Sequence, residues 1–102
     1  MRVYISGPMT GIHDLNYQAF QAAAERLRAQ GVQVISPHEI TPTGVGPWTW
    51  EAHMRVDLAA LLTADVIVML PGWQTSRGAQ LEKTVAEAIG LKVVDYALTE
   101  TL

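Results

Sequence analysis

The stretch Asp65-Val66-Ile67-Val68-Met69-Leu70 decides the fold class, because it is the most apolar run in this chain of 102 residues. A strand with one face in water would carry a polar residue at every second position. After Asp65 this run carries none, which is typical of a strand that helices cover on both faces. We therefore expect residues 65–70 to form a central strand of a parallel sheet.

Three further runs have the composition of strands and are bounded by Gly or Pro. They lie at Arg2–Ser6, Val32–Ser36 and Leu91–Tyr96. Apolar residues at helical spacing predict helices from Asn16 to about Gln30, from near Thr49 to Leu62, and from Thr75 or Ser76 to about Ile89. The buried positions of the first two helices would be Phe20, Ala23, Ala24, Leu27, Met54, Leu58, Leu61 and Leu62. Asn16 is expected to cap the first helix.

The alternation of strands and helices predicts one α/β domain over residues 1–102, because strand–helix–strand units make right-handed crossovers between parallel strands. The simplest arrangement is a small flavodoxin-like or Rossmann-like sandwich of three layers. Its parallel sheet would have four strands, or five, in the order 2-1-3-4. Ligands of such sheets bind beyond the carboxyl ends of the strands. The site should therefore lie at the loops after Ser6 and Ser36 and at the turn from Gly72 to Gly78. The long segment from His38 to Trp48 is expected to form a lid.

Composition narrows the classes of function. Seven Lys and Arg residues against ten Asp and Glu residues give a net charge of −3, which disfavours binding to duplex nucleic acid. No stretch approaches the roughly 20 apolar residues of a membrane span, and no secretory signal is recognisable. The chain has no cysteine, which suits the cytoplasm, where disulfides are rare. We expect a cytoplasmic protein that acts on a small molecule.

The sequence also argues against a metal centre and the common nucleotide cofactors. His13, His38 and His53 lack the spacing of zinc ligands. The dinucleotide pattern G-x-G-x-x-G and the Walker pattern are both absent. We therefore expect neither a metal ion nor a cofactor.

Two carboxylates are placed where they could act on a sugar. Glu82 comes about one helical turn after Ser76-Arg77-Gly78 and is directed back toward the start of the last helix. Asp57 lies close to the apolar side of the second helix, where an unpaired carboxylate is unusual. Two carboxylates that flank an anomeric carbon are what cleavage of a glycosidic bond requires. The alternative is that Glu82 is a surface group and that Asp57 pairs with Arg55 or Arg77.

Further residues near the same loops could bind a ligand. Gly7 and Pro8 follow the first strand directly, and a glycine there lets a ligand approach the backbone closely. The Ser76 hydroxyl and the Gly78 amide lie at a helix N-terminus, which favours an anion, and they could hold a phosphate or a hydroxyl group. Trp73 could stack on a nucleobase, as could Trp48 and Trp50. Each of these residues also has a purely structural explanation: a turn, a helix cap or an anchored loop.

Taken in order, these residues resemble a known family. The patterns are Tyr4-x-x-Gly7-Pro8, then Asp57 ahead of Ala64-Asp65-Val66-Ile67-Val68, then Ser76-x-Gly78-x-x-x-Glu82. They are similar to those of the nucleoside 2-deoxyribosyltransferase superfamily, which includes the 2′-deoxynucleoside 5′-phosphate N-hydrolases (Rcl-like). The resemblance covers nearly the whole chain and is closest to the small bacterial and phage members.

The resemblance implies a role for each matching residue. Glu82 would be the nucleophile that forms a covalent deoxyribosyl intermediate, and the Tyr4 hydroxyl would orient it. Asp57 would contact the sugar or assist departure of the base. Ser76 and Gly78 match the positions that bind a 5′-phosphate in the hydrolase branch. Members of the superfamily are typically homodimers or larger homo-oligomers, in which a neighbouring subunit completes each pocket.

The chain also departs from the superfamily pattern, and these departures keep other functions open. Thr10 stands where the phosphate-binding branch tends to carry an arginine, which Arg77 could replace. Gln80 stands where a small residue is common and could crowd the pocket. The leading expectation is cleavage of the N-glycosidic bond of a 2′-deoxynucleoside or its 5′-monophosphate, by hydrolysis or by transfer. The alternatives are a non-catalytic nucleotide-binding module and an N-ribohydrolase for another nucleoside such as NAD.

Overall fold

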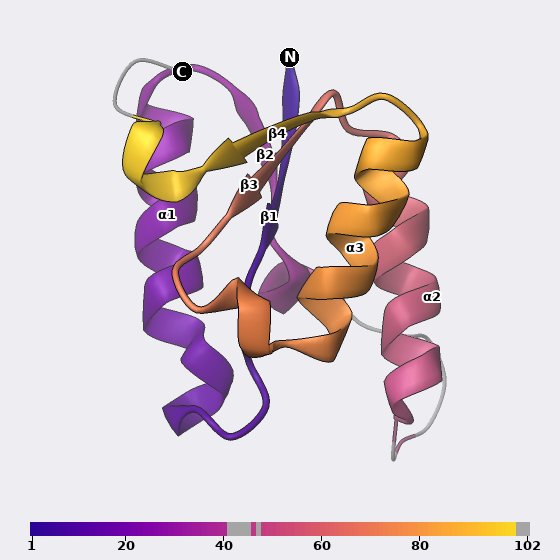
Figure 1. Ribbon diagram of the computed structural model, residues 1–102. Coiled ribbons are helices and arrows are strands. Elements are labelled where there is room, and N and C mark those ends of the chain that lie inside the picture. The colour runs from indigo at the N-terminus through magenta and orange to yellow at the C-terminus, as the bar shows by residue number, and fades with distance from the viewer. Residues whose placement is uncertain (41–45, 47, 100–102) are drawn as a thin grey trace.

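The structure confirms the predicted α/β architecture (Figure 1). The computed structural model describes residues 1–40, 46 and 48–99. Its four parallel strands, in the order β2-β1-β3-β4, are β1 (Arg2–Ser6), β2 (Gln33–Ile35), β3 (Val66–Met69) and β4 (Lys92–Asp95). All four residues of β3 are buried, as a central strand requires. The lid expected at His38–Trp48 includes residues 41–45 and 47, which lie outside the described residues.

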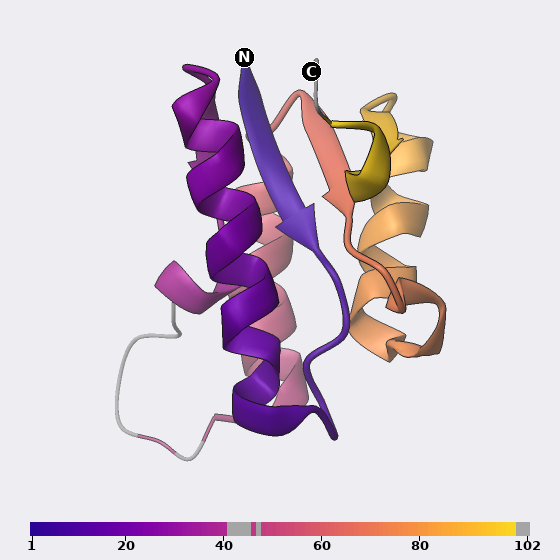
Figure 2. The same ribbon diagram turned by 90° about the vertical axis from the view of Figure 1, so that its left-hand side faces the viewer.

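Three helices complete a sandwich of three layers (Figures 1 and 2). α1 (Tyr17–Ala29) covers one face of the sheet, and α2 (Trp50–Leu61) and α3 (Arg77–Ala88) cover the other. Each helix begins and ends within one or two residues of its predicted limits. No helix in the described part of the chain is long and apolar enough to cross a membrane.

The hydrophobic core has two layers, one on each face of the sheet. Side chains of β1 contribute to both layers in turn, because successive side chains of a strand point to opposite faces. The layer between the sheet and α1 includes Val3, Ile5, Phe20 and Leu27. The layer on the side of α2 and α3 includes Tyr4, Ile67, Leu61 and Ala86. Ser6 follows Tyr4 by two residues and so faces the same side. That side also carries Asp57 and Glu82, the two carboxylates singled out in the sequence.

Two expectations about helix ends are wrong. Leu62 was expected on the buried side of α2, but it is 59% exposed, because the buried stripe of the helix runs through Met54, Asp57 and Leu61 and leaves Leu62 beside it. Asn16 precedes α1 without capping it: its φ is +62° and its side chain makes no capping hydrogen bond. Instead, Asn16 Nδ2 donates a hydrogen bond to the Pro8 carbonyl oxygen at 2.9 Å. Asn16 therefore ties the loop after β1 to the start of α1.

The loop between β1 and α1 contains a left-handed turn of three non-glycine residues. Asp14, Leu15 and Asn16 have φ values of 53°, 52° and 62°, a conformation that costs an L-residue roughly 1–2 kcal/mol. His38, in the loop after β2, has its Nε2 atom 2.9 Å from the Leu15 carbonyl oxygen. Its ring also packs edge-on against Phe20, with the centroids 4.9 Å apart. These contacts hold the turn against the neighbouring loop.

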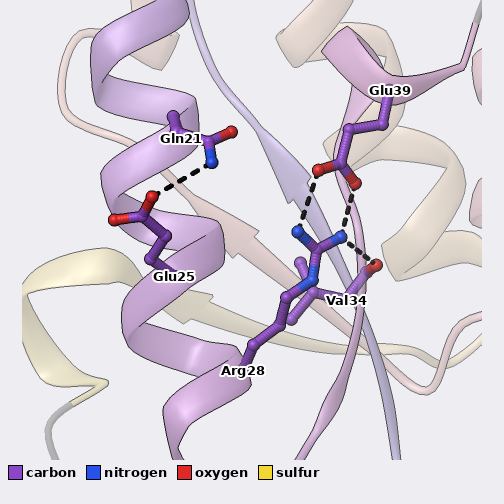
Figure 3. A network of polar contacts seen from close by, with 5 residues as sticks. All are labelled: Gln21, Glu25, Arg28, Val34 and Glu39. Atoms are coloured by element: carbon purple, nitrogen blue, oxygen red, sulfur yellow. Dashed lines mark hydrogen bonds and ion pairs between the residues drawn. The ribbon is translucent and has the colours of Figure 1, made fainter.

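A polar network links α1 to the segment that follows β2 (Figure 3). Arg28 of α1 makes a bidentate ion pair with Glu39, in which its Nη1 donates to Oε2 at 2.8 Å. Its Nη2 also donates to the Val34 carbonyl oxygen of β2 at 3.1 Å. Because Glu39 ends a short 3-10 turn, Pro37–Glu39, this one guanidinium joins α1, β2 and that turn.

Candidate active site

A cavity of about 770 Å³ lies at the carboxyl ends of β1 and β2 and at the start of α3. Its walls come from the loop after β1, the Pro37–Glu39 turn, one face of α2 and the first turns of α3. This is the region where the strand order predicts a ligand site. The cavity volume falls within the roughly 300–1,000 Å³ of small-molecule pockets, so a nucleoside or nucleotide is of suitable size.

The Glu82 carboxylate lies at the inner wall of this cavity between two hydroxyl groups. Tyr4 Oη donates a hydrogen bond to Glu82 Oε2, and Ser6 Oγ donates one to Glu82 Oε1 at 2.7 Å. Tyr4 and Ser6 are fully buried and Glu82 is 4% exposed. Of these three residues, only Glu82 lines the cavity. Both oxygens of the carboxylate are therefore held from behind while the group faces the cavity.

Local structure explains why these three side chains meet. Tyr4 and Ser6 are two residues apart on β1 and point to the side of the sheet that α3 covers. Ser76 caps α3, because its Oγ accepts a hydrogen bond from the Ala79 amide at 3.1 Å. Glu82 then follows Ala79 by three residues and precedes Ala86 by four, on the buried stripe of the helix.

Burial raises the pKa values of both acidic groups at the site. The pKa of Glu82 rises to about 7, mainly because burial removes its hydration, while the hydrogen bonds from Tyr4 and Ser6 lower it. The pKa of Asp57 rises to about 6 through burial. The pKa of Tyr4 lies well above its usual value of 10.0, through burial and the nearby charges of Glu82 and Asp57. Tyr4 therefore remains a donor at every pH at which a carboxylate titrates.

Asp57 lines the same cavity from α2, on the stripe that also carries Trp50, His53 and Met54. It is 9% exposed. The ion pair with Arg55 or Arg77 is not observed: the two ion pairs among the described residues are Arg28–Glu39 and Lys83–Glu87. Nor do three or more potential metal ligands gather in the described part of the chain. Asp57 is thus a buried carboxylate that lines the same cavity as Glu82.

The glycines of the site are accounted for by packing. A Cβ on Gly7 would lie 2.7 Å from Leu70 Cβ, so a side chain there would force β1 away from the segment after β3. A Cβ on Gly78 would lie 3.2 Å from Met54 Sδ, so this glycine allows α3 to approach α2. Both residues line the cavity together with Pro8, and neither φ is in the left-handed region. Close approach of a ligand to either backbone stays a prediction.

Arg77 lies at the start of α3 and borders the cavity together with Ser76. Its guanidinium carbon is 3.7 Å from the centroid of the Trp50 ring, which is a cation–π contact. Arg77 therefore lies at the cavity and stacks on an aromatic ring. It is the residue that could take the place of the arginine expected at position 10 from the resemblance. Thr10 itself also lines the cavity.

Two sequence expectations at this site need correction. Trp73, predicted to bind substrate, lies outside the cavity and lines a separate hollow beside β4, with Lys83 Nζ 5.2 Å from its ring centroid. It packs against the core layer on the side of α2 and α3, as an anchored tryptophan does. Gln80 does not crowd the cavity, because it is exposed and its Nε2 donates to the Gln74 carbonyl oxygen. Of the other tryptophans, Trp50 lines the cavity and Trp48 does not.

Sequence reasoning missed Ser6 and gave no role to His53. The signal for Ser6 was available, because a residue two positions after Tyr4 on a strand must share its face. His53 lies three residues after Trp50 and four before Asp57, which places it on the cavity stripe of α2. Its position follows from the helical period once Asp57 is placed at the site.

Comparison with known proteins identifies the family. Residues 1–95 match a family described as "Domain of unknown function (DUF4406)". The chain belongs to this family. No curated protein matches the DUF4406 chain in sequence.

Among solved structures, the DUF4406 chain is similar to a 2-deoxyribosyltransferase from the psychrotolerant bacterium Bacillus psychrosaccharolyticus. The two share 22% sequence identity and superpose with a TM-score of 0.72, over 93% of this chain and 71% of that enzyme. At this identity, the likeness shows that the two proteins share a fold.

Proposed function

We propose that this protein cleaves the N-glycosidic bond of a 2′-deoxynucleoside or its 5′-monophosphate, with Glu82 as the nucleophile. The observation that carries the proposal is the buried Glu82 carboxylate, which faces a nucleotide-sized cavity and accepts hydrogen bonds from Tyr4 and Ser6. A second buried carboxylate, Asp57, lines the same cavity. The shared fold with a 2-deoxyribosyltransferase supports the proposal.

The chemistry would proceed in two displacements. A Glu82 oxygen attacks C1′ of the sugar, the bond from C1′ to the base nitrogen breaks, and its electron pair leaves with the base, which takes up a proton. The product is an ester between Glu82 and the deoxyribose. In a hydrolase, water then attacks C1′, loses a proton and releases the sugar and the Glu82 carboxylate. In a transferase, a second base replaces that water.

The ionisation of the two carboxylates would set the pH dependence of this reaction. A nucleophilic Glu82 must be ionised, and its pKa is about 7, so the rate should rise as the pH increases through neutrality. If Asp57 protonates the leaving base, that rise is cut short, because Asp57 has the lower pKa, about 6. The active form, with Glu82 ionised and Asp57 protonated, is then most populated between pH 6 and pH 7, which gives a bell-shaped profile. If Asp57 only accepts a hydrogen bond from the sugar, the rate should reach a plateau.

The variant Asp57→Asn distinguishes the two roles of Asp57. An amide keeps the hydrogen-bonding capacity of the side chain but cannot supply the proton. Loss of base release by roughly 10²–10⁴-fold is expected for a general acid. Retention of most activity indicates a sugar ligand. The measurement is the initial rate of base release between pH 5 and pH 9 for both proteins.

The cavity mouth suggests how the rest of the substrate would bind. Arg77, Ser76 and Gly78 lie together at the start of α3, where helix amides and a cation favour a phosphate. Apolar residues such as Met9, Ile12 and Met54 line the cavity nearby and could contact the base. We further propose that the protein acts in the cytoplasm, which its lack of cysteine suits, and that it forms a homodimer or larger homo-oligomer, as the resemblance implies.

The test is a screen of deoxynucleosides and their 5′-monophosphates, with free base detected by mass spectrometry. The wild-type protein should release base, whereas Glu82→Gln should lower the rate at least roughly 10³-fold. Glu87→Gln is the matched control, because Glu87 lies on the same helix, is exposed and pairs with Lys83 at 3.2 Å. Binding without base release would support a nucleotide-binding module, and a preference for ribosides such as NAD would support an N-ribohydrolase.

A further inference from the structure

Among the described residues that donate a hydrogen bond to the Glu82 carboxylate, Ser6 has no role in the sequence patterns or in the proposed reaction steps. We propose that Ser6 is a positioning residue, which acts with Tyr4 to hold the Glu82 carboxylate in one orientation and to favour its ionised form. This inference rests on the proposed function, because it assigns a role within the same site.

The geometry gives each Glu82 oxygen its own donor. Rotation about the last bond of a glutamate side chain is soft and roughly two-fold, so a single donor leaves the carboxylate plane poorly defined. Tyr4 donates to Oε2 and Ser6 donates to Oε1 at 2.7 Å. Two donors on two different oxygens fix that rotation. They also leave the side of the carboxylate toward the cavity free for a reacting carbon.

The backbone of Ser6 is itself held in place. Ser6 pairs with Met69 in the β1–β3 ladder, and its carbonyl oxygen accepts a hydrogen bond from the Leu70 amide at 2.8 Å. The next residue, Gly7, has no room for a side chain against Leu70. Ser6 Oγ therefore occupies a position that the sheet defines and that does not depend on a mobile loop.

A hydrogen bond from Ser6 must favour the carboxylate anion. An ionised carboxylate only accepts hydrogen bonds, and charge-assisted bonds of this kind are roughly twice as strong as neutral ones. The other titratable groups facing Glu82 are Tyr4 on β1 and Asp57 on α2. His38, His53 and Arg77 line the same cavity. The hydrogen bonds that lower the pKa of Glu82 come from Tyr4 and from the serine hydroxyl of Ser6.

The experiment is an NMR titration of the Glu82 side-chain carboxyl carbon in wild type, Ser6→Ala and Ser36→Ala, with the signal assigned through Glu82→Gln. Ser36 is the matched control, because it is buried directly after the neighbouring strand β2 and does not line the cavity. Ser6→Ala should raise the pKa of Glu82 by about one unit, and Ser36→Ala should leave it unchanged. Ser6→Cys keeps a weaker donor and should give an intermediate shift, which serves as the test if the alanine variant does not fold.

The titration needs no substrate, so it separates this inference from the proposed function. An unchanged pKa of Glu82 in Ser6→Ala overturns the positioning role, whether or not the protein releases base. In wild-type protein that does release base, Ser6→Ala should lower kcat about tenfold with little change in KM. Where Asp57 is only a sugar ligand, the pH at which the rate rises should then move upward by the same shift that the titration measures.

Discussion

Burial of the Glu82 carboxyl should make the protein less stable as the pH rises. A carboxyl in a salt bridge has the opposite effect, because its pKa is lowered in the folded state. Its pKa is about 7 in the folded protein and 4.5 ordinarily, so between these values the folded state binds more protons than the unfolded state. The free energy of unfolding therefore falls as the pH rises from about 4.5 to about 7. The Asp57 carboxyl, with a pKa of about 6, acts in the same direction.

Glu82→Gln should consequently stabilise the protein at high pH. An amide oxygen can still accept a hydrogen bond, and the amide has no proton to lose. We expect the variant to be more stable than wild type at pH 8 by on the order of 3 kcal/mol, with little difference at pH 4. Urea unfolding at both pH values measures this. A wild type that is as stable as the variant at pH 8 would contradict the assigned burial of the charge.

Glu82→Ala provides the contrast to that substitution. It removes the acceptor of two fully buried hydroxyls, those of Tyr4 and Ser6. Each buried donor left without a partner costs about 1–3 kcal/mol, so this variant should be less stable than Glu82→Gln at every pH.

At the residue scale, the sequence indicated where the two carboxylates and Tyr4 lie, while the roles given to them stay predictions. Tyr4, Asp57 and Glu82 were placed together from a resemblance and from helical spacing. In the structure, Asp57 and Glu82 line one cavity and Tyr4 donates a hydrogen bond to Glu82 from outside it. Ser6 was overlooked because serine is common at the end of a strand and has no distinctive spacing. Trp73 was placed at the cavity because the sequence shows that it lies near a loop but does not show which way its side chain points. In the structure it packs against the core layer on the side of α2 and α3.

At the scale of elements, two glycines control how closely neighbouring segments pack. The Cβ of an alanine at position 7 would meet Leu70 Cβ at 2.7 Å, close to the backbone, whereas one at position 78 would meet the flexible Met54 side chain at 3.2 Å. We expect Gly7→Ala to cost about 3 kcal/mol or more and Gly78→Ala about 1 kcal/mol. Thermal and urea unfolding of the two variants measure the difference.

A double-mutant cycle tests the cause of the smaller effect. If Met54 limits the space at position 78, Gly78→Ala should cost less in a Met54→Ala background than in wild type. The same background should leave the cost of Gly7→Ala unchanged, because Gly7 packs against Leu70 instead. Additive effects of Gly78→Ala and Met54→Ala would show that the contact with Met54 is not the constraint.

The ion pair of Arg28 with Glu39 should matter little for stability. Both side chains are 40% exposed, and exposed pairs are worth about 0–1 kcal/mol. Glu39→Gln should therefore lower the free energy of unfolding by less than about 1 kcal/mol, with a smaller effect in high salt. The comparison is urea unfolding at low and at high sodium chloride. A loss of several kcal/mol would mean that the position of the Pro37–Glu39 turn depends on this pair.

The sequence predicted the elements themselves well, because hydrophobic periodicity reports directly on burial. It predicted the connections less well. Asn16 has the residue type of a helix cap, but its positive φ turns the side chain to the Pro8 carbonyl oxygen. The left-handed turn at residues 14–16 contains no glycine, the residue by which such a turn is usually predicted from sequence. Tertiary contacts, such as the one between His38 and Leu15, stabilise such a turn, and single-sequence patterns do not show these contacts.

At the scale of the whole molecule, apolar side chains remain exposed beside the cavity. Ile12 is 40% exposed, Leu15 is 56% exposed and Tyr17 is 43% exposed. Ile12 and Leu15 also line the cavity. A second copy of the chain would cover such residues, in keeping with the homo-oligomer that the resemblance implies. We predict self-association at micromolar concentration in sedimentation velocity experiments.

Leu15→Asn should weaken this association at least about tenfold. Asparagine tolerates the positive φ of this position better than most residues, so the turn should persist. Leu62→Asn is the matched control, since Leu62 is similarly exposed at 59% and lies at the end of α2. If both variants sediment like wild type, these side chains do not form the contact between copies.

The order of the strands has a consequence for biosynthesis. β1 is made before the other three strands described, yet in the finished sheet it lies between β2 and β3, so one of its edges has no partner until residues 66–69 have been made. Open strand edges are sites of mispairing between chains, and domains begin to fold from the N-terminus during synthesis. The Ser6 and Tyr4 hydroxyls lack their hydrogen-bond acceptor for longer still, because Glu82 follows them by 76 and 78 residues. Any product of interrupted translation that stops before Glu82 will carry the two hydroxyls without the acid between them.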